Sequence, residues 1–199
     1  MISNIIVFFY YIFTQRTDRR FVSLFMLKYY KDIEKIILTC KKIGCTQKIV
    51  QYSVSIFKLY VNNSKDEDVD SVIAASILLG CKISNYIIDI NRLTKNKSKV
   101  IEIEFDICKV LDFDFNQEDI YTKLVCYLTK YNISQDVAQY VWIFINDSVF
   151  IDVSKYDYDS IILACINLAC LVFDIDNKIE VNNSVKEIMN SILCVYEKN

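Results

Sequence analysis

The 199-residue chain is 53% hydrophobic and 24% charged, and its formal net charge is −2. A charge this close to balance gives no basic field that attracts nucleic acid, so we expect no direct nucleic-acid partner. The sequence has no His and only two Gly, which removes the commonest catalytic base and metal ligand and excludes Gly-rich phosphate loops. We therefore expect no metal and no cofactor.

The first segment in chain order, residues 1–19, contains the uncharged apolar run IIVFFYYIF (5–13), which Arg16, Arg19 and Arg20 follow. A membrane-spanning helix needs about 20 apolar residues, and no small-residue cleavage site of a signal peptide follows the run. We expect no membrane partner. The run is interpreted as a helix that packs on the main body, or as extra residues from an upstream start codon.

Along the rest of the chain, apolar residues recur at the three-and-four spacing of amphipathic helices. Gly44 suits the end of the first helix and Thr46 the start of the second, while Asn182 or Asn183 is an alternative start for the last. No segment shows the alternation that is typical of a half-buried strand. The predicted fold class is therefore all-α, with helices at 21–43, 46–60, 70–84, 97–112, 118–130, 134–150, 157–173 and 180–197, a loop at 62–70 and a short connecting segment at 86–94.

Eight Cys are spread along the chain, none of them as C-x-x-C. Cys40 and Cys45 are five residues apart, as are Cys165 and Cys170, and on a helix that spacing separates two side chains by roughly 140°. Such a pair does not suit a single metal ion. We interpret these residues as small buried hydrophobes in a reducing compartment.

One apolar helical sequence occurs twice in the chain. DSVIAASILLGC begins at Asp70, and DSIILACINLAC begins at Asp159, with identical residues at seven of twelve aligned positions. Ala75 in the first copy and Ala164 in the second are small residues that let neighbouring helices approach closely, and each copy is apolar nearly all round, as a fully buried helix is. The repeat predicts a tandem duplication of a roughly 90-residue helical bundle, each with this helix at its centre.

Two further stretches accompany the first copy. LLGCKISN (78–85) contains Lys82, and IEFDICKVLDFDF (103–115) places Glu104 ahead of an apolar pattern. In this order and spacing the chain resembles the cyclin family, whose first box carries L-A-x-K-x-E-E on its third helix and a Glu before L-x-x-L-x-F-x-L on its fifth. The match departs from the family in lacking both acids of the first run.

The second half resembles one subgroup more closely. WIFINDSVFID (142–152) and ILACINLAC (162–170) are similar to the W-x-x-x-N-D-[ST] and L-A-C-x-x-x-A-C runs of cyclin C, without the Pro-Pro that usually precedes the latter. The predicted first helix lacks the M-R-x-I-L-x-x-W signature of cell-cycle cyclins. The resemblance is therefore to the transcriptional type, closest to cyclin C, with cyclin H next.

The resemblance implies an all-α tandem pair of five-helix cyclin-box bundles, with the first box at 20–115 and the second at 116–199. It also implies a non-catalytic, nuclear regulatory subunit of a cyclin-dependent protein kinase, of the Mediator type or the general factor IIH type, that acts in RNA polymerase II transcription. Lys82 and Glu104 fall where cyclins place the pair that binds the kinase, so they are the expected kinase-binding residues. The alternative function is a cyclin-fold transcription-factor scaffold of the general factor IIB kind, without a kinase partner.

Three residues near the start of the second match have structural interpretations. Trp142 is expected to pack between the two bundles. Asn146 and Asp147 stand near a predicted helix end, and we expect them to hold a loop rather than contact a partner.

Overall fold

The computed structural model describes residues 24–63, 68–115, 118–152, 156–176 and 179–196, and side chains from residue 29 onward. These residues contain helices and no strands, which confirms the all-α prediction. The helices are α2 (Leu24–Ile43), α3 (Gln47–Asn63), α4 (Val69–Ile83), η1 (Ile90–Arg92), α5 (Lys97–Val110), α6 (Ile120–Lys130), α7 (Gln135–Asp147), η2 (Ser148–Phe150), α8 (Tyr158–Val172) and α9 (Asn183–Tyr196).

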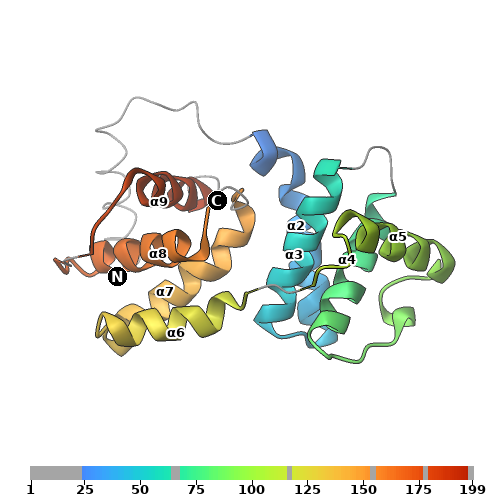
Figure 1. Ribbon diagram of the computed structural model, residues 1–199, viewed down its shortest axis with the longest axis horizontal. Coiled ribbons are helices and arrows are strands. Elements are labelled where there is room, and N and C mark those ends of the chain that lie inside the picture. Colours follow the sequence, from blue (N-terminus) through green and yellow to red (C-terminus); the bar gives the residue numbers. More distant parts are fainter. Residues whose placement is uncertain (1–23, 64–67, 116–117, 153–155, 177–178, 197–199) are drawn as a thin grey trace. The chain divides into compact units, whose positions relative to one another are not determined.

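The chain divides into two compact units, of which one is Tyr29–Asp119 and the other includes Ile120–Asn199. In the described residues each unit has four α-helices and one short 3-10 helix (Figure 1). The first unit contains α2 from Tyr29 onward, α3 to α5 and η1, and the second contains α6 to α9 with η2. Each unit is described on its own below.

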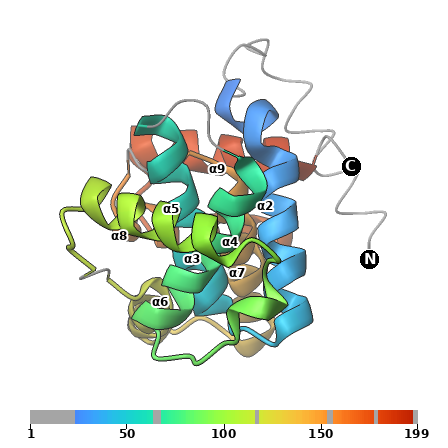
Figure 2. The same ribbon diagram turned by 90° about the vertical axis from the view of Figure 1, so that its right-hand side faces the viewer.

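The duplicated helix lies at the centre of each unit, as the repeat predicts. In the first unit α4 packs against α3 and α5, and in the second α8 packs against α6, α7 and α9 (Figures 1 and 2). Ala75 in α4 and Ala164 in α8 are both 0% exposed. Side chains on nearly every side of each helix are buried, so both helices contribute most of their surface to a core.

A glycine allows α3 and α4 to approach closely. A Cβ atom added at Gly80 would lie 2.5 Å from the Ser53 hydroxyl oxygen and 3.2 Å from the Ser53 backbone nitrogen. Ser53 is 0% exposed, and its hydroxyl donates a hydrogen bond to the carbonyl of Ile49. The buried hydroxyl therefore occupies the space that a larger residue at position 80 would need.

The two central helices also begin alike. Asp68 and Asp157 cap them, each three residues before a serine: Asp68 accepts the hydroxyl hydrogen of Ser71 at 2.7 Å, and Asp157 accepts that of Ser160 at 3.1 Å. These caps satisfy backbone and side-chain donors that a helix start leaves free. Both sequences read D-x-D-S, so the repeat extends two residues upstream of the twelve aligned positions.

The second acid of each D-x-D-S run pairs with a lysine of the first helix that the structure describes in the same unit. Asp70 lies 2.5 Å from the ammonium of Lys35 in α2, and Asp159 lies 3.0 Å from that of Lys123 in α6. Asp159 also accepts a 2.7 Å hydrogen bond from the hydroxyl of Tyr127. In each unit, therefore, the acid at this position of the run forms an ion pair between the central helix and the first helix that the structure describes.

Several helices end on residues with positive φ. Gly44 has a φ of +82°, which confirms it as the end of α2. Only two glycines are present, and the other left-handed positions are occupied mostly by Asn and Asp, whose short polar side chains tolerate that region. The non-glycine residues with positive φ are Asn85, Asp112, Phe113, Asn132 and Asp174.

In the described residues the α-helix boundaries lie within three residues of the predicted ones, and α3 extends to Asn63, two residues into the loop predicted at 62–70. The helix expected at 134–150 ends at Asp147, and a 3-10 turn continues to Phe150. The connecting segment at 86–94 contains the 3-10 helix η1. The last helix begins at Asn183, where Asn182 accepts a 2.8 Å hydrogen bond from the backbone N–H of Val185, so the alternative start proposed from sequence is the observed one.

Side chains near the end of α7 tie the second unit together. The Trp142 ring stacks on that of Tyr121 in α6, with centroids 5.2 Å apart and 7° between the planes. Asn146 accepts a 2.9 Å hydrogen bond from the Tyr121 hydroxyl, and Asp147 accepts one from the hydroxyl of Tyr196 in α9. Asn146 and Asp147 therefore hold helices of their own unit.

The remaining expectations concern thiols, metals and membranes. All eight cysteines are free, and Cys40, Cys81, Cys165 and Cys170 are buried. Within the described ranges, no three His, Cys, Asp or Glu side chains are grouped so that they could hold a metal ion. None of the helices in the described part of the chain is long and apolar enough to cross a bilayer. The apolar run at 5–13 lies outside the described residues.

Candidate functional site

The structure brings together the two residues that the sequence singled out. Lys82 lies in the last turn of α4 and Glu104 in the second turn of α5. The Lys82 ammonium is 2.7 Å from one carboxylate oxygen of Glu104 and 2.8 Å from the other. The pair spans the edge where α4 and α5 pack together.

The two partners differ in burial. The Glu104 side chain is 9% exposed, whereas that of Lys82 is 58% exposed. A carboxylate that is this buried needs a cation or hydrogen-bond donors to offset its lost hydration, and Lys82 provides both. The burial of Glu104 is a finding that the sequence did not predict.

The exposed end of the pair can still bind another molecule. An ammonium group has three N–H donors, and Lys82 directs them toward two carboxylate oxygens while more than half of its side chain faces solvent. Its position in the last turn of α4 also places the cation where the helix dipole favours it. The geometry suits an external backbone carbonyl.

Large apolar side chains are exposed on α5, the helix that carries Glu104, and just after it. Ile101, Phe105 and Phe113 are 54%, 54% and 55% exposed, and we call these three residues the α5 apolar surface. The rings of Phe105 and Phe113 lie edge to face with centroids 6.1 Å apart, and the Lys109 ammonium lies 4.4 Å from the centre of the Phe105 ring. These exposed apolar side chains form a candidate interaction surface.

The backbone holds Phe113 in this position. Asp112 and Phe113 have φ values of +49° and +56°, a region that costs a non-glycine residue roughly 1–2 kcal/mol. The Phe113 N–H donates a 2.9 Å hydrogen bond to the carbonyl of Cys108, which turns the chain back at the end of α5. The turn places a large ring in solvent beside Phe105, at a conformational cost that the fold tolerates.

Sequence reasoning missed Ile101 and Phe105. Ile103 and Ile107 face the core and are 0% and 1% exposed. Ile101 and Phe105 are also one turn apart, but on the side of α5 that the core does not need. The sequence does contain a signal for these exposed residues, because it places two large apolar side chains on the non-core face of an amphipathic helix.

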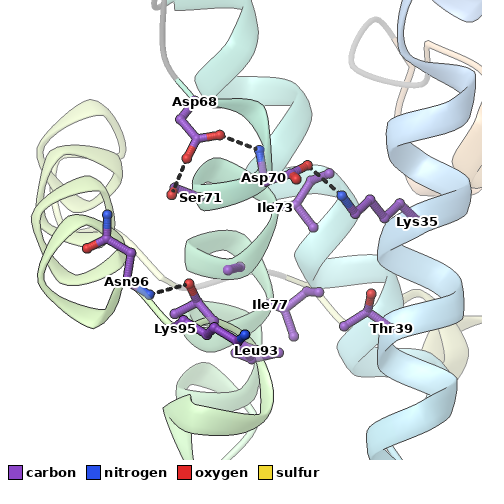
Figure 3. Close-up of a pocket in the computed structure, with 12 residues that line it drawn as sticks. Lys35, Thr39, Asp68, Asp70, Ser71, Ile73, Ile77, Leu93, Lys95 and Asn96 are labelled. Atoms are coloured by element: carbon purple, nitrogen blue, oxygen red, sulfur yellow. Dashed lines mark hydrogen bonds and ion pairs between the residues drawn. The ribbon is translucent and has the colours of Figure 1, made fainter.

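A separate pocket of about 360 Å³ lies between α2, α4 and residues 93–96 of the first unit (Figure 3). Lys35 and Asp70 pair across its wall, and Asp68 caps α4 from the same wall. Because both carboxylates have partners within the fold, the pocket offers no acid–base pair for catalysis. We assign no chemistry to it.

Comparison with known proteins gives matches only among solved structures: no family model and no curated protein matches the chain. The chain is similar to a chain of the yeast RNA Pol II CTD kinase CTDK-1 complex, with 18% identity, a TM-score of 0.72 and coverage of 90% of this chain and 67% of that one. It is also similar to a chain of the yeast TFIIK (Kin28/Ccl1/Tfb3) complex, with 17% identity, a TM-score of 0.69 and coverage of 84% and 86%.

A third structure has the same arrangement. A chain of the CAK complex of Chaetomium thermophilum bound to ATP-gamma-S matches with 14% identity and a TM-score of 0.63, over 87% of this chain and 62% of that one. At these identities the likeness establishes the fold. The chain has an all-helical fold of two tandem cyclin-box bundles.

Proposed function

We propose that this chain is a cyclin-like regulatory subunit that binds and activates a cyclin-dependent protein kinase in RNA polymerase II transcription. It acts in the nucleus and carries out no chemistry itself, and its two boxes span residues 20–115 and 116–199. The observation that carries the proposal is the Lys82–Glu104 pair beside the α5 apolar surface, on a fold that is shared with chains of CTDK-1, TFIIK and CAK complexes.

Activation of this kind follows from kinase chemistry. A protein kinase holds ATP correctly only when a Glu of its C-helix pairs with the Lys of its third strand. A subunit that binds the C-helix only in its inward position shifts the kinase population toward the active state. The regulatory subunit therefore needs an apolar surface to hold a helix and polar groups to fix its position.

The site on this chain has both parts. The α5 apolar surface can bury one face of a kinase helix, since exposed aromatic rings are effective interface anchors. Lys82 can donate to a backbone carbonyl, and Glu104 can accept from a backbone N–H. A charge-assisted contact of this type is worth roughly 1.5–3 kcal/mol.

Two classes of kinase partner are proposed, a Mediator-type kinase and a general factor IIH-type kinase. The resemblance of residues 142–170 to cyclin C favours the Mediator type. Affinity purification of the tagged full chain, followed by mass spectrometry of the kinase that co-purifies, identifies the class. Recovery of no kinase under conditions that preserve other nuclear complexes contradicts the proposed function.

Two double variants test the site itself. We expect Lys82→Ala with Glu104→Ala, and separately Phe105→Ala with Phe113→Ala, to yield folded proteins that capture less than about a tenth of the kinase captured by the wild type. The matched control is Ile143→Ala, which shortens an apolar side chain that is 47% exposed in α7 of the other unit. Wild-type capture by both double variants would overturn the assignment of this surface.

A further inference from the structure

Three thiols meet where α4 ends. Cys40 lies in the last turn of α2, Cys45 in the connection between α2 and α3, and Cys81 in the last turn of α4. The sulfur atoms of Cys45 and Cys81 are 3.7 Å apart, and the Cys40 thiol is in hydrogen-bonding contact with Cys45. Cys40 and Cys81 are fully buried, whereas Cys45 is half-buried.

Backbone contacts hold this cluster together. The Cys45 N–H donates a 2.9 Å hydrogen bond to the carbonyl of Cys40, and the Tyr86 N–H donates one of 2.8 Å to the carbonyl of Cys81. The Tyr86 hydroxyl also lies 3.2 Å from the carbonyl oxygen of Ile43 and 3.4 Å from that of Gly44. The chain that leaves α4 is thus bound to the connection that carries Cys45.

We propose that Cys45 and Cys81 form a reversible thiol–disulfide pair that a peroxide oxidises, and that the disulfide weakens kinase binding through the adjacent residue Lys82. The second half of this proposal rests on the proposed function, whereas the first half does not. The pair is distinct from the polar contacts of the kinase-binding surface, but it lies one residue from them in sequence.

One molecule of hydrogen peroxide converts the two thiols to one disulfide and leaves two molecules of water. The Cys45 thiolate attacks an oxygen of hydrogen peroxide, the O–O bond breaks, and the released hydroxide takes a proton, which leaves a sulfenic acid and one water. The sulfur of Cys81 then attacks the sulfenic sulfur, the S–O bond breaks, and the departing hydroxide takes the Cys81 proton as a second water. Two thiols lose two electrons in total, and the peroxide gains them.

Burial decides which thiol reacts first. Cys45 is the member of the pair that peroxide can reach, because Cys81 is 0% exposed. Burial also raises the pKa of the Cys81 thiol, so at neutral pH this residue carries its proton. Cys45 is therefore the attacking residue, and Cys81 resolves the sulfenic acid.

Disulfide formation draws Cys45 in the connection after α2 and Cys81 in the last turn of α4 together. A disulfide bond is about 2.05 Å long, so the two sulfur atoms have to approach by about 1.7 Å. The proposal requires that the last turn of α4 takes up part of this movement, and Lys82 is the residue after Cys81 in that turn. Lys82 makes two contacts under 3 Å with Glu104, which a displacement of this size disrupts.

The first test measures the disulfide in the full chain. The reduced protein is treated with hydrogen peroxide, free thiols are blocked with N-ethylmaleimide, and non-reducing peptide mapping follows. We expect a peptide that links Cys45 to Cys81 in the wild type and in the control Cys126→Ser, whose cysteine is exposed on α6. We expect no such link in Cys45→Ser or Cys81→Ala. Absence of the link in the wild type overturns the proposal.

The second test measures how readily the Lys82 amine is acylated in the absence of a kinase. The acetate ester of N-hydroxysuccinimide acetylates accessible lysine amines. The ion pair with the Glu104 carboxylate protects the Lys82 nitrogen from this reagent. We expect acylation of Lys82, relative to Lys130 in the second unit, to rise about fivefold on oxidation in the wild type and not in Cys45→Ser. Unchanged acylation in a chain that contains the disulfide would show that the thiol pair does not act on Lys82.

The third test uses the kinase that co-purifies with the tagged chain. We expect the oxidised wild type to bind this kinase about fivefold more weakly than the reduced wild type, and oxidised Cys45→Ser to bind like the reduced protein. Equal binding by the oxidised and reduced wild type overturns the regulatory half of the proposal. A reduced chain that binds no kinase contradicts the proposed function instead, and the first two tests still decide the thiol pair.

Discussion

The ammonium of Lys82 contacts both carboxylate oxygens of Glu104, at 2.7 Å and 2.8 Å, across 22 residues of sequence and between two helices. Because the Glu104 side chain is only 9% exposed, we expect the pair to stabilise the first unit as well as to present a polar group at its surface. We therefore expect a substitution at either residue to change the stability of the fold as well as the proposed kinase binding, and the two effects have to be measured separately.

A double-mutant cycle measures the contribution of the pair to folding. Lys82→Ala leaves a buried carboxylate without its cation, so we expect this single variant to lose about 1 kcal/mol of unfolding free energy in urea titrations. The double variant with Glu104→Ala removes that unpaired charge, and we expect a coupling energy of about 1 kcal/mol between the sites. Strictly additive losses would show that the ion pair does not stabilise the fold.

Position 80 tests the close approach of α3 and α4. Gly80→Ala gains helix propensity but places a methyl group 2.5 Å from the buried Ser53 hydroxyl, so we expect a net loss of about 1–3 kcal/mol. Adding Ser53→Ala removes the clashing oxygen, and we expect part of the stability to return in thermal melts. A Gly80→Ala variant as stable as the wild type would show that the two helices separate without cost.

The duplicated helix predicts equivalent effects in both units. Ala75→Leu and Ala164→Leu each add three carbon atoms to a position that is 0% exposed, and we expect each to cost about 1–3 kcal/mol. Ala138→Leu is the matched control, since this residue is only partly buried in α7. If Ala75→Leu and Ala164→Leu melt like the control, the two helices do not have close-packed centres.

Asp147 predicts a pH dependence of stability. Burial raises the pKa of this carboxyl above its usual 3.8, and the hydrogen bond from Tyr196 only partly opposes the effect. A group with a raised pKa in the folded state contributes stability below its unfolded pKa and loses it as the pH rises through the folded value. We therefore expect Asp147→Asn, which keeps an acceptor for Tyr196, to gain stability relative to the wild type as the pH rises from about 3.8 toward neutrality.

The control for Asp147 is Asp136→Asn, the same change at an exposed position of α7. Urea titrations of the wild type and both variants at several pH values provide the comparison. If the difference in unfolding free energy between Asp147→Asn and the wild type does not change with pH, the pKa of the buried Asp147 carboxyl is not raised.

The core could be predicted from sequence because burial leaves a periodic signal. The repeat at Asp70 and Asp159 predicted which helix lies at the centre of each unit, since small and apolar residues on all sides suit no other place. Gly44 predicted the end of α2 because glycine alone has no penalty at φ +82°. The ends of α4 and α8 were predicted to within one residue, but the positive φ of Asn85 and Asp174 beyond them was not, since Asn and Asp occur in many other turns as well.

The candidate site was predicted less completely. Lys82 and Glu104 came from the resemblance to cyclins, since periodicity alone does not show which of many charged residues will meet. The burial of Glu104 depends on how α4 and α5 pack, which no local pattern encodes. The left-handed backbone at Phe113 is likewise set by the turn after α5, so the exposed ring beside Phe105 could not be read from spacing.

The D-x-D-S run at the start of α4 and α8 combines a helix start with a tie to an earlier helix. Asp68 and Asp157 begin the helices, while Asp70 and Asp159 reach Lys35 and Lys123 in the same unit. Within four residues, each run therefore sets both where the central helix begins and which earlier helix it contacts, so moving the run along the chain would move the helix start and the ion pair together.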